Sequence, residues 1–238
     1  MKKIWAVLIL LAAVFISYAP ALGNGFVWDD TALIARDPLI RSWRLAGEAF
    51  NHFLFIDATP SDFYRPLQRL TYEIDYQFAG LQPALYHFTS ILYHAFAAIS
   101  LLFLAEELLV SFAVERGRAR IISLVAVLVW AIHPIQSAAV VYVSGRADLL
   151  AAGFGFLGLF CCTRARYANN SGKFALIATG GLAFLLSAFS KEVGLIFPLL
   201  AVVFALIQRN WRLLWKTAGV TTFVVAIYLV LRLGAEHY

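Results

Sequence analysis

Long apolar runs constrain this sequence more than any other feature. A transmembrane helix needs about 20 predominantly apolar residues, and runs near that length occur seven times. They occupy residues 4–22, 84–105, 119–134, 145–162, 174–189, 193–208 and 216–233. Because 62% of the 238 residues are hydrophobic and only 14% are charged, the chain has too few polar residues to cover a water-facing surface. We therefore exclude a soluble enzyme, a disordered protein and a nucleic-acid-binding protein, and predict an all-α integral membrane protein with about seven transmembrane helices.

The apolar runs divide the chain into three regions. Residues 1–22 form the first predicted transmembrane helix, although the small residues at 19–21 also allow a cleaved signal peptide. Residues 23–83 are polar and aromatic and contain four prolines. They include no run long enough to span, so we predict a large extracytoplasmic loop with short amphipathic helices, for example at 43–54. Residues 84–238 supply a six-helix membrane bundle, which we expect to be incomplete at its C-terminus.

Charge in the short loops predicts the orientation of the chain. Lys and Arg gather on the cytoplasmic side of membrane proteins. The N-terminus and the three loops on its side carry a summed charge of +8, whereas residues 23–83 carry eight acidic and five basic side chains. We therefore predict a cytoplasmic N-terminus, with residues 23–83 and the last residues outside. The expected location of this multi-pass protein is the bacterial inner membrane.

Two cations lie at predicted helix starts on the outer side. Arg146 opens the fourth run and Lys191 opens the sixth. Helix N-termini attract anions through free N–H groups and a positive dipole end, so these positions predict a phosphate site at the level of the outer lipid headgroups. Asp148 and Glu192 lie in the same first turns and are further candidates for substrate binding. Alternatively, the acids complement the helix dipoles and the cations reach lipid headgroups.

Two adjacent carboxylates, Asp29 and Asp30, directly follow the first predicted helix. When two carboxylates are close, the pKa of one of them is raised, which suits a general base. The pair is therefore a candidate catalytic site. The alternative is that Asp29 only caps a short helix that begins near Thr31.

Three histidines lie in or beside the apolar runs. His87 and His94 are seven residues apart, nearly two helical turns, and so share one helix face, while His133 ends the third run. A zinc site formed by the three is conceivable, but this spacing is not specific. Hydrogen bonds from the rings to backbone carbonyls are the simpler interpretation. These residues require no metal, and no cofactor is evident from the sequence.

Six short motifs, taken in order, resemble a known family. They are Trp28-Asp29-Asp30, Tyr64-Arg65-Pro66-Leu67, Tyr86-His87 with Tyr93-His94-Ala95, His133-Pro134, Gly145-Arg146-Ala147-Asp148-Leu149-Leu150 and Lys191-Glu192. Their order resembles the amino-terminal half of the transmembrane and tetratricopeptide-repeat O-mannosyltransferases and their bacterial relatives. That family is similar to the dolichyl-phosphate-mannose–protein mannosyltransferases of the GT-C class.

The resemblance implies a GT-C-like glycosyltransferase. Such an enzyme transfers a sugar, here mannose-like, from a polyprenyl-phosphate carrier to a protein Ser or Thr hydroxyl or a glycan on the non-cytoplasmic face. The implied roles, by position, are a catalytic base at Asp29 or Asp30, stabilisation of the leaving phosphate by Arg65, Arg146 and Lys191, and lining of the pocket by His87 and His133. The expected partners are membrane lipid, the lipid-linked donor and the acceptor, without nucleic acid.

The chain also differs from that family. It has no tetratricopeptide repeats and fewer spans than a complete GT-C enzyme. We therefore keep two alternatives: a non-catalytic membrane scaffold that retains the fold, and a lipid-linked-sugar transporter. The second would be expected to show broken helices at the bilayer midplane and repeated halves, and neither pattern is evident in the sequence.

Overall fold

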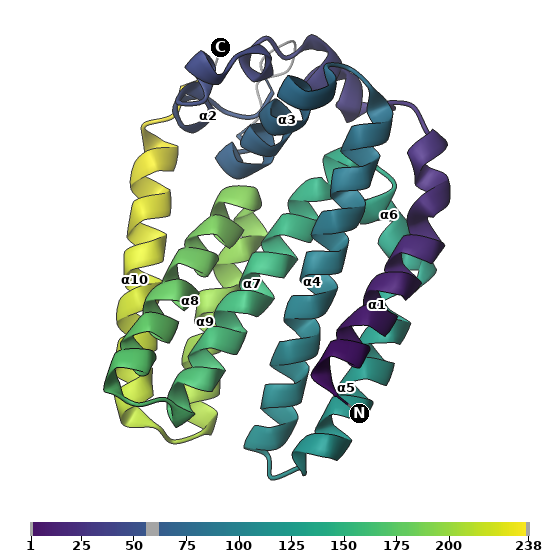
Figure 1. The fold of residues 1–238 in the computed structure, drawn as a ribbon. Helices are drawn as coiled ribbons and strands as arrows, with labels where there is room; N and C mark the ends of the chain where they lie inside the picture. The colour runs from purple at the N-terminus through teal and green to yellow at the C-terminus, as the bar shows by residue number, and fades with distance from the viewer. Residues whose placement is uncertain (1, 56–61, 237–238) are drawn as a thin grey trace.

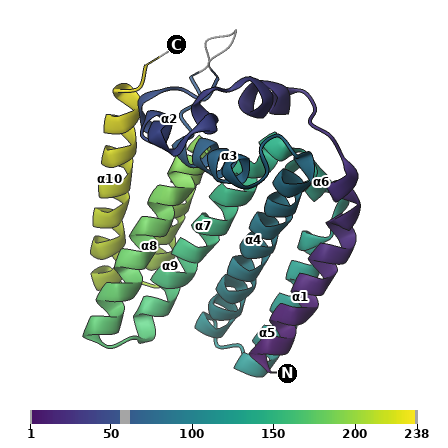
Figure 2. The same cartoon turned by 45° about the horizontal axis from the view of Figure 1, so that its top comes forward.

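A bundle of long helices forms the body of the protein. The computed structural model describes residues 2–55 and 62–236 (Figure 1). The segment after the first helix, residues 24–55 and 62–82 and hereafter the loop domain, covers one end of the bundle. The N-terminus lies at the opposite end, and the C-terminal end of the chain lies beside the loop domain (Figures 1 and 2).

Helices occupy all of the predicted apolar runs. The helices of the bundle are α1 (Lys3–Tyr18), α4 (Pro83–Ser111), α5 (Arg116–Ala131), α6 (Ser137–Val140), α7 (Arg146–Arg164), α8 (Asn170–Ser190), α9 (Ile196–Ile207) and α10 (Trp211–Leu233). Single 3-10 turns extend several of them, at Ala19–Gly23, Pro134–Gln136, Val143–Gly145, Ala165–Tyr167 and Glu192–Leu195.

Five of these helical segments are long and apolar enough to cross a membrane. They are Lys3–Gly23, Pro83–Ser111, Val143–Tyr167, Asn170–Ser190 and Trp211–Leu233. A sixth candidate is the pair Arg116–Ala131 and Pro134–Val140, which is bent by 55°. The remaining predicted run forms the shorter apolar helix Glu192–Ile207. The chain is therefore an all-α, multi-pass membrane protein, and seven spans in a GT-C arrangement stay a prediction.

The bend follows from the local sequence at His133-Pro134. Proline has no N–H to continue the helix and its ring blocks the preceding turn. His133 takes an extended conformation, and its Nδ1 accepts a hydrogen bond from the N–H of Ile135 at 3.2 Å. A new short turn therefore begins at Pro134 and redirects the chain toward α6.

α7 lies in the middle of the bundle and packs against α4, α8 and α9 (Figure 1). Its glycines allow this contact: a Cβ on Gly158 would lie 2.4 Å from the ring of Phe184, and one on Gly155 would lie 2.2 Å from Phe197. Two apolar cores flank α7. One joins α1, α4 and α5, and the other joins α8, α9 and α10.

The loop domain is largely helical. It contains α2 (Glu48–Asn51), α3 (Pro66–Ala79), a π-helical turn at Thr31–Arg36 and two 3-10 turns at Leu39–Arg41 and Trp43–Leu45. The predicted helix at 43–54 is thus two separate short turns, while the longer α3 was not predicted. α3 begins with a proline in its first turn and ends before Gly80, whose φ is +57°. Both features are typical helix boundaries.

Candidate functional site

Asp30 anchors the loop domain to the start of α7. It is fully buried, and its Oδ1 accepts hydrogen bonds from the N–H and the hydroxyl of Ser144 at 2.8 and 2.5 Å. Its Oδ2 accepts a further hydrogen bond from the N–H of Val27 at 3.2 Å. A buried carboxylate is costly unless its oxygens are hydrogen-bonded, and these donors meet that need. The structure therefore gives Asp30 a structural position without access to solvent.

Asp29 is exposed. Its N–H donates to the hydroxyl of Tyr142 at 3.3 Å. Burial, and then the adjoining Asp29 carboxylate, raises the pKa of Tyr142 to about 12, so this hydroxyl is protonated at neutral pH. The preceding residue, Trp28, has a φ of +48°, in the left-handed region that non-glycine residues rarely adopt. Trp28 is 84% exposed, and its ring meets the ring of Tyr142 edge-on, with centroids 6.0 Å apart.

A cavity of about 500 Å³ opens beside Trp28 and Tyr142. The segment after α1 forms one wall of it, and the segment around α6 forms the other. The lining residues are Asn24, Gly25, Val27, Trp28, Ser137, Ala138, Val141 and Tyr142. Exposed Asp29 thus directly follows Trp28, a residue of the cavity wall, whereas Asp30 is buried.

A second cavity, of about 220 Å³, lies between α4, α5, α7 and α9. Its polar side chains are Asp148, Lys191 and Gln136. Lys191 Nζ donates to Asp148 Oδ1 at 2.7 Å. The Lys191 side chain is 27% exposed and the Asp148 side chain is 53% exposed. Most other lining residues are apolar, and they are Ala97, Trp130, Ala139, Leu149, Ala151, Ala152, Val193 and Phe197. The site therefore combines an accessible cation with apolar walls at the loop-domain end of the membrane helices.

Arg65 forms an ion pair with Glu192, the residue that follows Lys191 in the sequence. Arg65 Nη2 and Nε donate to Glu192 Oε2 at 3.0 and 3.2 Å, and the guanidinium stacks on the ring of Phe63 at 4.4 Å. This contact joins the start of α3 to the turn after α8. The second carboxylate oxygen of Glu192 is buried without a hydrogen-bond partner.

Arg146 occupies a different environment from Lys191. It is fully buried, and its Nη1 lies 2.6 Å from Asp75 Oδ2 on α3. Its other donors reach the carbonyl of Tyr86 at 2.8 Å and the hydroxyl of Thr89 at 2.7 Å. With its hydrogen bonds made inside the protein, Arg146 joins α3, α4 and α7, and it lies outside the cavity that holds Lys191.

The three histidines do not come together. His94 is buried, with Nε2 2.8 Å from the carbonyl oxygen of Ala131, as the simpler interpretation predicted. His133 is exposed and caps the turn after α5. His87 is buried near the backbone of residues 24–25, and its ring nitrogens make no hydrogen bond of ordinary geometry. Within residues 2–55 and 62–236, no group of three His, Cys, Asp or Glu side chains could hold a metal ion.

Sequence reasoning missed the acidic partners in the loop domain. Asp75 pairs with Arg146, and Asp37 pairs with Arg69 at 3.1 Å, with all four side chains buried. One signal was present in the sequence. Gln68, Tyr72 and Asp75 recur at the spacing of one helix face, and all three are buried. A polar face of that kind predicts a helix packed against other polar groups.

Curated proteins similar to this chain are protein O-mannosyl-transferases. One from Caenorhabditis elegans is 27% identical over 95% of this chain and 31% of its own length. Protein O-mannosyl-transferase TMTC4 of Homo sapiens is 30% identical over 71% of this chain and 24% of its own length. Protein O-mannosyl-transferase TMTC3 of Mus musculus is 30% identical over 79% of the chain and 20% of its own length.

The chain spans less than a third of the length of these relatives. No family model matches it, and no solved structure matches it. The resemblance that the motifs predicted is nevertheless confirmed by the aligned sequences. The chain is similar to the transmembrane and tetratricopeptide-repeat O-mannosyltransferases.

Proposed function

We propose that the protein carrying this chain transfers a sugar to a hydroxyl of a protein acceptor. The observation that carries this proposal is the similarity to protein O-mannosyl-transferases over as much as 95% of the chain. The names of these relatives favour mannose as the sugar and attachment through an oxygen atom of a protein. The proposed source of that oxygen is a Ser or Thr hydroxyl. The helices that could cross a membrane are consistent with a substrate supplied from the bilayer.

The proposed donor is a sugar linked to a polyprenyl phosphate. The cavity around Lys191 suits such a molecule, because its apolar walls would contact an isoprenoid chain and its cation would contact the phosphate. Half-exposed ion pairs contribute little to stability, so a phosphate could replace the Asp148 carboxylate on Lys191 at small cost. Arg65, on the adjoining ion pair with Glu192, is the second proposed phosphate contact.

The proposed base is Asp29. Its carboxylate would take the proton of the acceptor hydroxyl as that oxygen attacks the anomeric carbon of the sugar. The bond from that carbon to the phosphate oxygen breaks, and the bonding pair leaves with the lipid phosphate. Cations held close to the leaving phosphate stabilise its increasing negative charge. Asp30 and Arg146, fully buried and hydrogen-bonded inside the protein, are proposed to hold the site in position.

Solvent exposure also separates the two histidines that were predicted to line the pocket, His87 and His133. Exposed His133 stays a proposed contact, since it directly precedes the turn toward α6, which lines both cavities. His87 is buried near residues 24–25 and is proposed to support the backbone beneath the first cavity.

We further propose that the loop domain faces away from the cytoplasm and that the N-terminus is cytoplasmic. The support is the excess of Lys and Arg at the opposite end of the bundle. The prediction of a bacterial inner membrane finds no support, because the relatives reported above are animal proteins.

The test compares Asp29→Asn with Asp30→Asn in the full-length protein. Transfer from polyprenyl-phosphate mannose to a Ser/Thr peptide is measured together with thermal unfolding in detergent. Removing a general base typically costs about 10²–10⁴-fold in rate. We expect that loss for Asp29→Asn with unchanged unfolding, whereas Asp30→Asn should lower the unfolding temperature.

Glu48→Gln serves as a control, because this loop-domain carboxylate lies in α2, outside both cavities. It should retain full transfer activity. Full activity of Asp29→Asn would overturn the assignment of the base. A wild-type protein that binds no polyprenyl-phosphate mannose would overturn the enzyme proposal and favour the scaffold.

A further inference from the structure

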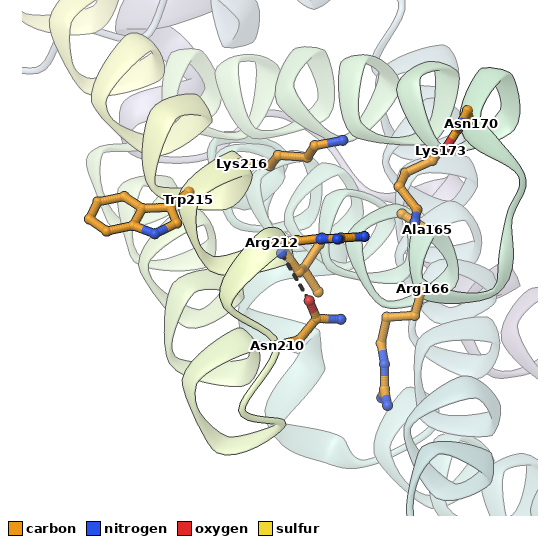
Figure 3. Close-up of a pocket in the computed structure, with 9 residues that line it drawn as sticks. Ala165, Arg166, Asn170, Lys173, Asn210, Arg212, Trp215 and Lys216 are labelled. Atoms are coloured by element: carbon orange, nitrogen blue, oxygen red, sulfur yellow. Dashed lines mark hydrogen bonds between the residues drawn. The ribbon is translucent and has the colours of Figure 1, made fainter.

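The end of the bundle opposite the loop domain holds a strongly basic cavity. Its volume is about 540 Å³, and it lies between the turn after α7, the start of α8 and the start of α10. Four cations line it: Arg166, Lys173, Arg212 and Lys216. Figure 3 shows Lys173 extending from α8, and Arg212 and Lys216 extending from α10 toward α8. No acidic side chain is among the residues that line the cavity.

These four cations differ from their neighbours at the same end of the bundle. Arg116, Arg120 and Arg164 are all paired with Glu106 or Glu107 on α4, at 3.0–3.5 Å. In the part of the chain that the structure describes, no ion pair involves any of the four cavity cations. Arg166 Nη1 is moreover buried without a hydrogen-bond partner. The charges of Lys173, Arg212 and Lys216 are therefore available to an anion from outside the chain.

A separate, apolar cavity lies along the same two helices. Its volume is about 400 Å³, and Phe174 and Leu182 of α8 line it together with Val220 and Phe223 of α10. Phe174 directly follows Lys173, and Val220 lies one helical turn beyond Lys216. The charged and apolar cavities thus follow each other along the groove between α8 and α10.

The basic cavity lies at the ends of two candidate membrane spans, Asn170–Ser190 and Trp211–Leu233. Trp215 lines it and is 74% exposed. Tryptophan is enriched at the membrane–water interface, with its ring among the headgroups. Clusters of Lys and Arg at that level attract anionic lipids, and here the apolar groove begins within one turn of the charges.

We propose that this site binds an anionic membrane lipid, with the phosphate headgroup among Lys173, Arg212 and Lys216 and an acyl chain along the groove between α8 and α10. The charge of the cavity selects a phosphate, and the adjoining groove selects a lipid over a free phosphate ion. The site lies at the opposite end of the bundle from the proposed donor site, so it does not depend on the proposed function. A lipid bound in this site would contact both α8 and α10 near the N-terminal ends of these helices.

The test measures phosphatidylglycerol binding by the full-length protein in detergent, using native mass spectrometry and thermal unfolding. The variant Lys173→Gln/Lys216→Gln removes two charges from the cavity. Each basic residue near an anionic headgroup strengthens binding about fivefold, so we expect the loss of two of them to weaken binding about 25-fold. The control Arg118→Gln/Arg209→Gln removes two charges from exposed positions outside both cavities at the same end and should bind as the wild type does.

Two further binding measurements distinguish an anionic lipid from other possible ligands. Phosphatidylcholine tests the need for negative charge, and glycerol 3-phosphate tests the need for an acyl chain; we expect both to bind weakly. Ala178→Trp, at an exposed position of the groove, should weaken phosphatidylglycerol binding without removing a charge. Equal losses in the two double variants, equal binding of phosphatidylcholine, or equal binding of glycerol 3-phosphate would each overturn the proposal.

Discussion

The two ends of the helix bundle use cations in opposite ways. At the loop-domain end, Arg69 and Arg146 are buried and each is paired with a carboxylate. At the other end, Lys173 and Lys216 extend into a cavity without an acidic partner. A buried charge must be paired inside the protein, because its loss of hydration is otherwise uncompensated. A cation that stays accessible has no such need, so it can meet an anion from outside.

This difference changes which motif residues are expected to meet a substrate. Arg146 and Lys191 look equivalent in the sequence, since each opens an apolar run beside an acidic residue. Only Lys191 remains in reach of a ligand in a cavity. Within the loop-domain end, then, one cation is buried in an ion pair and the other is partly exposed in a cavity.

The largest expected effect is on stability, from Arg146→Met. The change leaves Asp75 buried without its partner, and breaking a buried ion pair from one side costs about 3–5 kcal/mol. Lys216→Met, at the basic end, should change stability by less than about 0.5 kcal/mol. Unfolding of both variants in mixed micelles would measure the contrast. A loss below about 1 kcal/mol for Arg146→Met would mean that this pair does not hold the loop domain in place.

A smaller, pH-dependent effect is expected from Glu73→Gln on α3. Glu73 is buried, and burial, followed by the nearby Asp37 carboxylate, raises the pKa of Glu73. A carboxyl whose pKa is raised in the folded state contributes stability below its unfolded pKa and loses that contribution as pH rises through the folded value. The variant should therefore gain stability relative to wild type as pH rises from about 4 to 7. Parallel pH profiles of the unfolding temperature would contradict this.

The smallest expected effect on stability is that of Lys191→Met. Its partner Asp148 is half-exposed, and such ion pairs contribute about 0–1 kcal/mol. If the proposed donor site is right, transfer activity should nevertheless fall about 10²–10³-fold, as for the loss of other groups that stabilise transition-state charge. Activity and unfolding measured on one preparation would separate the two effects. Unchanged transfer would remove Lys191 from the proposed mechanism.

The helices could be predicted from the sequence, whereas the contacts of the loop domain could not. Every predicted apolar run is helical, and even the bend at His133-Pro134 follows from a single proline. The prediction for 43–54 missed the break between its short turns, and α3 was not predicted, because its face packs through polar side chains such as Gln68 and Asp75. Apolar periodicity does not report a helix of that kind.

For the candidate site, the residue types were evident from the sequence but their accessibility was not. Asp29 and Asp30 are adjacent and chemically identical, yet one is exposed and the other accepts hydrogen bonds from Ser144, more than a hundred residues away. No local pattern records such a long-range contact.

The sequence by itself determined that this chain is a helical membrane protein and which known transferases it is similar to. Both conclusions depend on local quantities: the length of an apolar run and the residues of a short motif. Only the tertiary structure decided which charges are paired and buried and which line cavities. Ion pairing depends on which side chains from distant segments come within about 4 Å of each other, and that proximity is a property of the packed helices.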